Sequence, residues 1–286
     1  MPNYRIDDIV SVIEYMEEHL TEKLNLDRVA DAVHYSKYHL HRMFTGAVGI
    51  TLHEYLNRRR LTQSAKLLVF SDKNILDIAL LAGYESQQAF TNIFTAMYKM
   101  PPSRYRENEK FYPLQLKYNL KGNFEMLHVK DQINWKIEFA AEEDIPRWME
   151  LVRLVIDGFP YLDEQDYIKV LRKRIQTGQA LILKDRQTAI GILLFSYDTG
   201  SIDFMGCHPL YRNRGIQKAF LRKVMDELQT GRDISITTYR EGDKADTGQR
   251  REIKALGFAE AELLTEFGYP TQRFVLSTAA PDQPLP

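Results

Sequence analysis

Two serines fifty positions apart, Ser36 and Ser86, each stand directly before a short segment whose hydrophobic residues recur at the spacing of a helix. Serine is a preferred N-cap because its hydroxyl accepts a hydrogen bond from an N–H group of the first turn. Each serine follows, across a tight turn, another short helix whose predicted cap is Asn25 or Asn74. The repeat predicts two helix-turn-helix units joined by one long helix from about Leu52 to Val69. A generic helical bundle, which also contains capped helices and tight turns, is the alternative.

Length and composition indicate a folded protein of two domains. The chain has 286 residues, 44% hydrophobic and 27% charged, which exceeds what one domain usually needs. Its single cysteine, Cys207, excludes an intrachain disulfide and a multi-cysteine metal site, and we expect no metal. No apolar run of about 18 residues exists, so we expect no membrane span. The polar start at residues 1–8 is unlike a secretory signal, which predicts a cytoplasmic protein.

The charge balance excludes nucleic-acid binding by bulk positive charge. The formal net charge is -1, and residues 1–108 hold 13 Lys and Arg against 13 Asp and Glu. A basic domain is the usual electrostatic mark of a nucleic-acid binder. If this chain binds DNA, its positive side chains must therefore be arranged locally.

The pattern changes along the chain from helical to mixed. Beyond Asn134, strands with alternating apolar residues are interspersed with helical stretches. Alternation over Leu114–Leu120 and Phe124–Val129, separated by Lys121-Gly122, predicts a β-hairpin in the linker. The expected organisation is a helix-turn-helix domain, a linker, an α+β domain and a disordered tail, over residues 1–108, 109–133, 134–277 and 278–286.

Motifs across residues 26–106 narrow the class of the first domain. They are Ser36–Phe44, Arg60–Ala65, Ile78-Ala79, Gly83–Gln88, Asn92–Phe94 and Pro102–Arg106. Together they resemble the double helix-turn-helix of the AraC/XylS family of transcription regulators. The resemblance is strongest to the branch of multiple-antibiotic-resistance and superoxide-response activators. One departure is Lys99, where that family usually has glycine; it should alter a local turn and leave the fold unchanged.

The two serine-capped helices carry side chains that suit base recognition. Arginine can bond guanine bidentately, glutamine can bond adenine, and an aromatic ring can contact a thymine methyl group. The resemblance implies that the two helices enter successive major grooves on one face of the DNA. Arginines after the second helix, with Ser103 and Lys66, would contact phosphates. The candidate DNA-binding residues are Lys37, Tyr38, His41, Arg42, Gln87, Gln88, Asn92, Arg104 and Arg106.

Several of these residues have structural interpretations as well. The triplet Arg58-Arg59-Arg60 favours a solvated or ion-paired helix face over base contacts. Tyr38 alone is typical of a partly packed aromatic side chain. His41 suits either a groove contact or an uninvolved exposed position. Gln87-Gln88, directly after a capping serine, favours base contact.

The stretch Ser201–Lys218, with Leu256-Gly257-Phe258 further on, resembles the GNAT N-acetyltransferase family. There a strand leads through an R-x-x-G loop into a helix whose free N–H groups face the coenzyme pyrophosphate. The predicted fold class is thus multidomain, an all-α homeodomain-like double helix-turn-helix followed by an α+β GNAT-like domain. The resemblance implies acetyl-CoA or another acyl-CoA as cofactor, bound by Met205, Cys207, Arg212, Asn213, Arg214, Gly215, Ile216 and Gln217.

Two departures from the GNAT pattern affect the expected chemistry. Gln217 replaces a small residue where the phosphates should lie, and Ile253 stands where many members have a tyrosine that protonates the leaving thiolate. Asp203 is the candidate base for deprotonating an amine, with a surface or ion-paired aspartate as the alternative. Tyr239 is the candidate acid, and Tyr269 is an equal substitute. Cys207 is interpreted as a small core residue and not as a nucleophile.

The leading hypothesis is a sequence-specific transcription regulator whose C-terminal domain binds acyl-CoA or a small amine, as sensor or as acetyltransferase. One alternative is a working small-molecule N-acetyltransferase that regulates its own operon. Another is a GNAT fold used only for dimerisation. The two departures favour sensing. Double-stranded DNA and acyl-CoA are the expected partners, RNA polymerase is a further candidate, and no membrane is expected.

Overall fold

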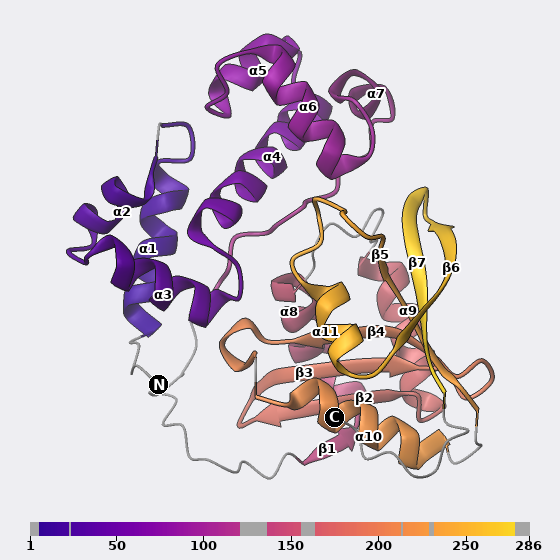
Figure 1. Ribbon diagram of the computed structural model, residues 1–286. Coiled ribbons are helices and arrows are strands. Elements are labelled where there is room, and N and C mark those ends of the chain that lie inside the picture. Colours follow the sequence, from indigo (N-terminus) through magenta and orange to yellow (C-terminus); the bar gives the residue numbers. More distant parts are fainter. Residues whose placement is uncertain are drawn as a thin grey trace. The chain divides into compact units, whose positions relative to one another are not determined.

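The computed structural model describes residues 6–22, 24–120, 136–155, 164–212, 214–228 and 232–277. They form two compact units, a helical one up to residue 120 and a mixed α/β one from residue 136 (Figure 1). This order of a helical half followed by an α/β half confirms the predicted fold class. None of the helices in these ranges is long and apolar enough to cross a membrane.

The helical unit contains the predicted twin helix-turn-helix arrangement. The long helix α4 joins a first unit of α2 and α3 to a second unit of α5 and α6, with α1 before and α7 after. Ser36 Oγ accepts the N–H of His39 at 3.3 Å, and Ser86 Oγ accepts the N–H of Ala89 at 3.1 Å, which confirms both caps. The helices span Ile6–Glu18 (α1), Leu26–Ala32 (α2), Lys37–Val48 (α3), Leu52–Phe70 (α4), Ile75–Leu81 (α5), Gln87–Tyr98 (α6) and Pro102–Glu107 (α7).

The two serine-capped helices also end alike. Gly49 follows α3 in the left-handed conformation, with φ of 84°, and its N–H donates to the Thr45 carbonyl at 2.9 Å. Lys99 follows α6 with φ of 60°, and its N–H donates to the Thr95 carbonyl at the same distance. This is the left-handed C-cap, which glycine adopts without steric penalty. The departure at Lys99 thus places a side chain in a conformation that favours glycine.

The arginine triplet of α4 is packed against the helical unit instead of facing solvent. Arg58 and Arg59 are 1% and 5% exposed. Arg59 makes a bidentate ion pair with Glu17 of α1, at 2.6 and 2.7 Å. Arg60 donates to the Leu20 carbonyl at 2.8 Å. The ion-paired interpretation is therefore confirmed for Arg59, and the solvated face is wrong for Arg58 and Arg59.

The predicted hairpin in the linker is wrong where the structure describes it. Leu114–Leu120 forms no strand, and its backbone bonds instead to side chains of α4. The Thr62 hydroxyl accepts the N–H groups of Leu114 and Gln115, each at 3.1 Å. A segment with alternating residues forms a strand only when another strand supplies its backbone hydrogen-bond partners, and here side chains of a helix supply them. The second predicted strand, Phe124–Val129, lies outside the described residues.

The second unit is built on a seven-stranded sheet of order β1-β2-β3-β4-β5-β7-β6. All neighbours are antiparallel except β4 and β5, which are parallel. The turn at Phe267-Gly268, with φ of 51° and 77°, joins β6 to β7, which starts at Tyr269. The strands span Ile137–Phe139 (β1), Ala180–Asp185 (β2), Thr188–Phe195 (β3), Ser201–Cys207 (β4), Ile234–Tyr239 (β5), Ala259–Glu266 (β6) and Tyr269–Leu276 (β7).

Helices cover both faces of this sheet, as Figure 1 shows. They are α8 (Ile145–Val155), α9 (Glu164–Gln176), α10 (Ile216–Leu228) and α11 (Gln249–Ala255). A Cβ on Gly191 of β3 would lie 2.5 Å from Phe220 of α10, and one on Gly206 of β4 would lie 2.9 Å from Val155 of α8. Gly206 is paired with Ile192, the neighbour of Gly191, so the two glycines face opposite sides. Both glycines therefore allow close helix packing.

The parallel strands β4 and β5 pair only at their beginnings. Ser201 and Ile202 pair with Ser235 and Ile236, and the described register ends there. From Asp203 onward β4 keeps β3 as its partner on one side and has no strand pairing with β5 on the other. The two strands thus diverge towards their carboxyl ends, which leaves backbone groups of β4 facing the gap.

Candidate DNA interface and acyl-CoA site

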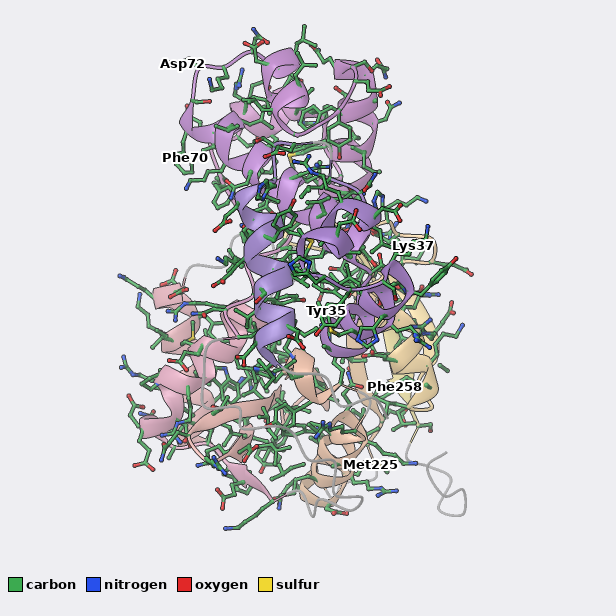
Figure 2. All side chains as sticks on the ribbon, turned by 90° about the vertical axis from the view of Figure 1, so that its left-hand side faces the viewer. Tyr35, Lys37, Phe70, Asp72, Met225 and Phe258 are labelled. Carbon is green, nitrogen blue, oxygen red and sulfur yellow. The ribbon has the colours of Figure 1, made fainter. Side chains whose placement is uncertain are left out.

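The first candidate DNA-reading surface is the outer face of α3. Lys37, Tyr38, His41 and Arg42 are all exposed there, Tyr38 by 74%. Leu40 and Phe44, on the opposite face of the helix, are completely buried. Burial of this apolar stripe orients α3, so that the four predicted side chains face solvent, as Lys37 does in Figure 2.

A hollow of about 690 Å³ lies over this face. It contains one acidic residue that the sequence analysis did not single out. Asp27 of α2 forms an ion pair with Lys37 at 3.2 Å, and the Lys37 ammonium lies 5.8 Å from the centre of the Tyr38 ring. The ion pair joins two different helices, α2 and α3, so no local sequence motif predicts it. The hollow is lined by Leu26, Asp27, Lys37, Tyr38, His41 and Arg42.

The second candidate surface is the beginning of α6. Gln87, Gln88 and Asn92 are exposed, while Phe90 and Phe94 are completely buried. The Gln88 amide donates to Asn92 Oδ1 at 2.9 Å, one turn further along. This bond brings two of the predicted base-contacting residues together.

The predicted phosphate contacts divide into two groups. Arg104, Ser103 and Lys66 are exposed. Arg106 is partly buried, and it donates to the carbonyls of Leu68 at 3.0 Å and Lys73 at 2.5 Å. Those bonds fasten α7 to the end of α4. Arg106 therefore has a structural role in the helical unit, whereas the other three side chains face solvent.

In the second unit, the loop between β4 and α10 is the predicted phosphate cradle, and it leaves open space at its glycine. Gly215 has φ of 74°, and no heavy atom lies within 4 Å of the position a Cβ would take. The α10 helix starts at the next residue, Ile216, which is buried. Arg212 and Arg214 flank the loop, and the Arg214 guanidinium lies 5.2 Å from the centre of the Tyr211 ring. Asn213, also predicted here, lies outside the described residues.

Gln217 does not lie free beside this cradle. Its amide donates to Glu252 of α11 at 2.8 Å, which links the two helices. Sequence reasoning missed Glu252, since the bond joins residues thirty-five positions apart and belongs to no motif. Burial raises the pKa of the Cys207 thiol to about 12, so this thiol stays protonated at neutral pH. Met205, two residues earlier on β4, is partly exposed.

The candidate catalytic residues are engaged in other contacts. Asp203 accepts the Arg174 guanidinium of α9 at 2.5 Å and the Ser201 hydroxyl at 2.6 Å. Tyr239 packs edge-on against Tyr269, with ring centres 5.9 Å apart. The Tyr269 hydroxyl in turn donates to the Asp243 carboxylate at 3.0 Å. The ion-paired alternative considered for Asp203 thus describes its environment.

A buried histidine lies directly after β4. His208 is 3% exposed, and its Nδ1 accepts the N–H of Leu210 at 3.3 Å. Burial, aided by the charge of Arg212, lowers the pKa of His208 to about 3. It therefore remains neutral over the physiological range. Within the described residues, no group of three or more His, Cys, Asp and Glu side chains is placed to hold a metal ion.

Comparisons with known proteins define the class of the helical half. Residues 29–108 match the family model described as a helix-turn-helix domain. The regulatory protein SoxS of Salmonella typhimurium is 42% identical over 98 residues, which cover 34% of this chain and 92% of that protein. With the twin units described above, this makes the chain a helix-turn-helix DNA-binding protein. It belongs to the AraC-type family of transcription regulators.

Coverage is lower for another relative. The uncharacterized HTH-type transcriptional regulator YbfP of Bacillus subtilis is 40% identical over 98 residues, and this chain spans 33% of its length. A crystal structure of a GNAT-family acetyltransferase from Bacillus cereus has a TM-score of 0.40 and 15% sequence identity. That likeness covers 50% of this chain and 96% of the other. The interpretation of the C-terminal half therefore depends on its own geometry.

Proposed function

We propose that this protein regulates transcription by reading two successive major grooves with α3 and α6, under the control of an acyl-CoA bound by its C-terminal half. The observation that carries the DNA part is the placement of Arg42 and Gln88 on the outer faces of α3 and α6. Each is an exposed polar side chain in the first turns of a serine-capped helix whose other face is buried. Such a helix inserts its first turns into the major groove.

The side chains suggest distinct roles at the DNA. Arg42 suits guanine and Gln88 suits adenine, because each can form two hydrogen bonds with the edge of that base. Tyr38, with its ring in solvent, suits a thymine methyl group or a sugar. Arg104 suits a phosphate, which positions the protein without selecting a sequence.

Alanine variants should therefore distinguish base-contacting residues from phosphate-contacting ones by how much DNA affinity they lose. On a duplex selected by the wild-type chain from a random pool, Arg42→Ala and Gln88→Ala should each cost about 1–3 kcal/mol, with little loss on random DNA. Arg104→Ala should weaken binding to both duplexes alike and reduce the salt slope by about one. Gln63→Ala, an exposed residue of α4, is the matched control. Equal losses on selected and random DNA for all three variants would contradict the assignment.

The acyl-CoA part is supported by the region between β4 and α10. The diverging strands leave backbone groups of β4 unpaired, and these suit the amide-rich pantetheine arm. The open space at Gly215 and the charges of Arg212 and Arg214 suit the pyrophosphate. The Gln217–Glu252 bridge links α10 to α11 beside this loop, so we expect it to open when the coenzyme enters.

Sensing is favoured over acetyl transfer by the state of the candidate catalytic groups. Asp203 is held by Arg174, so deprotonating an amine there would disrupt an ion pair. Ile253, 5% exposed, has no proton to give to a leaving thiolate. When bound, acyl-CoA would supply an activated acyl group. In this proposal it serves as an effector.

Two measurements test the acyl-CoA proposal. A ligand at 100 times its Kd should stabilise the folded chain by about 2.7 kcal/mol, so acetyl-CoA should raise the melting temperature. The double variant of Arg212→Ala and Arg214→Ala should lose that shift, whereas Arg172→Ala on α9 should retain it. If no acyl-CoA changes the melting temperature, the proposal that the C-terminal half binds acyl-CoA is wrong. Thiol release with a panel of amines would favour the acetyltransferase instead.

A further inference from the structure

The segment from Phe111 to Leu120, here called the strap, is packed along α4 although it follows the last helix of the helical unit. At its beginning, Tyr112 and Tyr105 of α7 exchange hydrogen bonds, with the Tyr112 N–H donating at 2.9 Å and the Tyr105 hydroxyl donating back at 3.1 Å. The Tyr112 ring also lies 5.2 Å from that of Tyr98, at the end of α6. This part of the strap thus contacts the C-terminal end of α6, the second candidate recognition helix.

The middle of the strap is bonded to the centre of α4. One hydroxyl, Thr62 Oγ1, accepts two consecutive strap N–H groups, as described above. Arg58 donates to the Leu114 carbonyl at 3.1 Å, and Arg59 donates to the Gln115 carbonyl at 2.7 Å. Leu114 and Gln115 are 1% and 3% exposed, so these bonds are shielded from competing water.

The end of the strap is linked to the first helix-turn-helix unit through α4. The Tyr118 ring stacks on Tyr55 of α4 with centres 5.4 Å apart, and Tyr55 meets Phe44 of α3 edge-on at 5.8 Å. Phe44 is completely buried on the inner face of the first recognition helix. A continuous series of packed side chains therefore leads from the strap to α3.

We propose that the strap sets the spacing between the two recognition helices. A single helix, α4, joins the two units, and long helices are rarely straight but curve around what they pack on, so its packing partners influence how the units are oriented. The strap is a second connection: it packs against α6, is bonded to the centre of α4, and is linked to α3 through Tyr55. The inference rests on the proposal that α3 and α6 read neighbouring grooves. It extends the DNA-reading unit beyond residue 108, and Thr62, Arg58 and Tyr118 become positioning residues that need not touch DNA.

The test uses the full chain with Thr62→Val, which retains the volume of the side chain and removes the shared acceptor. Ser64→Ala is the matched control, because Ser64 lies on the same helix, is 2% exposed, and donates only to the Arg60 carbonyl of its own helix. Both are titrated with a selected duplex, with duplexes retaining one half-site, and with duplexes whose half-sites are two base pairs closer or further apart.

We expect Thr62→Val to weaken binding to the complete site by about tenfold, to change half-site binding by less than about twofold, and to reduce discrimination between spacings. Ser64→Ala should match the wild type. Equal losses on complete and half sites, or no loss on either, overturn the inference. If Thr62→Val is unfolded, Tyr118→Leu decides by the same criteria. A wild type that binds complete and half sites equally overturns paired-groove recognition itself and the strap's role with it.

Discussion

Replacing Lys99 with glycine should stabilise the helical unit. Lys99 ends α6 with φ of 60°, whereas the equivalent residue after α3 is Gly49 with φ of 84° and the same hydrogen bond to a threonine carbonyl. A left-handed conformation costs an L-residue about 1–2 kcal/mol, and the greater freedom of unfolded glycine offsets about 0.5–1 kcal/mol of that gain. Lys99→Gly should therefore stabilise by about 0.5–1 kcal/mol, or raise the melting temperature by about 2–6 °C.

The assay can assign the change to the correct half of the chain. Both tryptophans, Trp135 and Trp148, lie after the helical unit, so their fluorescence follows the second half while circular dichroism at the helix band weights the first. Lys99→Gly should move the dichroism transition and leave the fluorescence transition unchanged.

Two controls separate backbone strain from side-chain contacts. Lys99→Ala removes the hydrogen bond that Lys99 Nζ donates to the Ala96 carbonyl at 2.7 Å but retains a Cβ, so it should give no stabilisation. Gly49→Ala should destabilise the first unit by about 1 kcal/mol. If Lys99→Gly leaves the melting temperature unchanged, or if Lys99→Ala stabilises equally, the strain argument is wrong.

Two further predictions concern the second half. Because the pKa of His208 is lowered from 6.5 to about 3, the unfolded chain binds a proton that the folded chain excludes between these values. The contribution of neutral His208 to the free energy of unfolding is therefore fully present above about pH 6.5 and falls by roughly 1.4 kcal/mol per pH unit below it. The urea midpoint followed by fluorescence should be lower at pH 5 than at pH 7. The difference should be smaller in His208→Gln. Glu252→Gln removes a negative charge beside the cradle and should tighten acetyl-CoA binding in calorimetry, unlike Glu143→Gln; an unchanged or weaker Kd would argue against coenzyme phosphates at Gly215.

Local patterns predicted the recognition helices well. Ser36 and Ser86 were identified as caps because capping depends on a side chain and N–H groups three residues away. The exposure of Arg42 and Gln88 follows from the same periodicity that buries Leu40 and Phe90. These are interactions within one helix, and a sequence window contains both partners.

Contacts between distant segments were not predicted in the same way. Alternation at Leu114–Leu120 indicated a strand, yet the backbone partners are side chains of α4 more than fifty positions earlier. Arg58 and Arg59 look like surface charges until the strap carbonyls and Glu17 are placed beside them. Nothing local distinguishes a solvated arginine from one whose partners arrive from elsewhere in the chain.

The amino-acid sequence alone determined the twin capped helices, the side chains they present and the loop glycine at Gly215, because each depends on neighbouring residues. Only the tertiary structure decided that Arg106 is tied to carbonyls, that Asp203 is held by Arg174, and that Gln217 is bonded to Glu252. A polar side chain acquires its role from whichever donor or acceptor folding brings within about 3 Å, and that partner is selected by the packing of whole helices and strands.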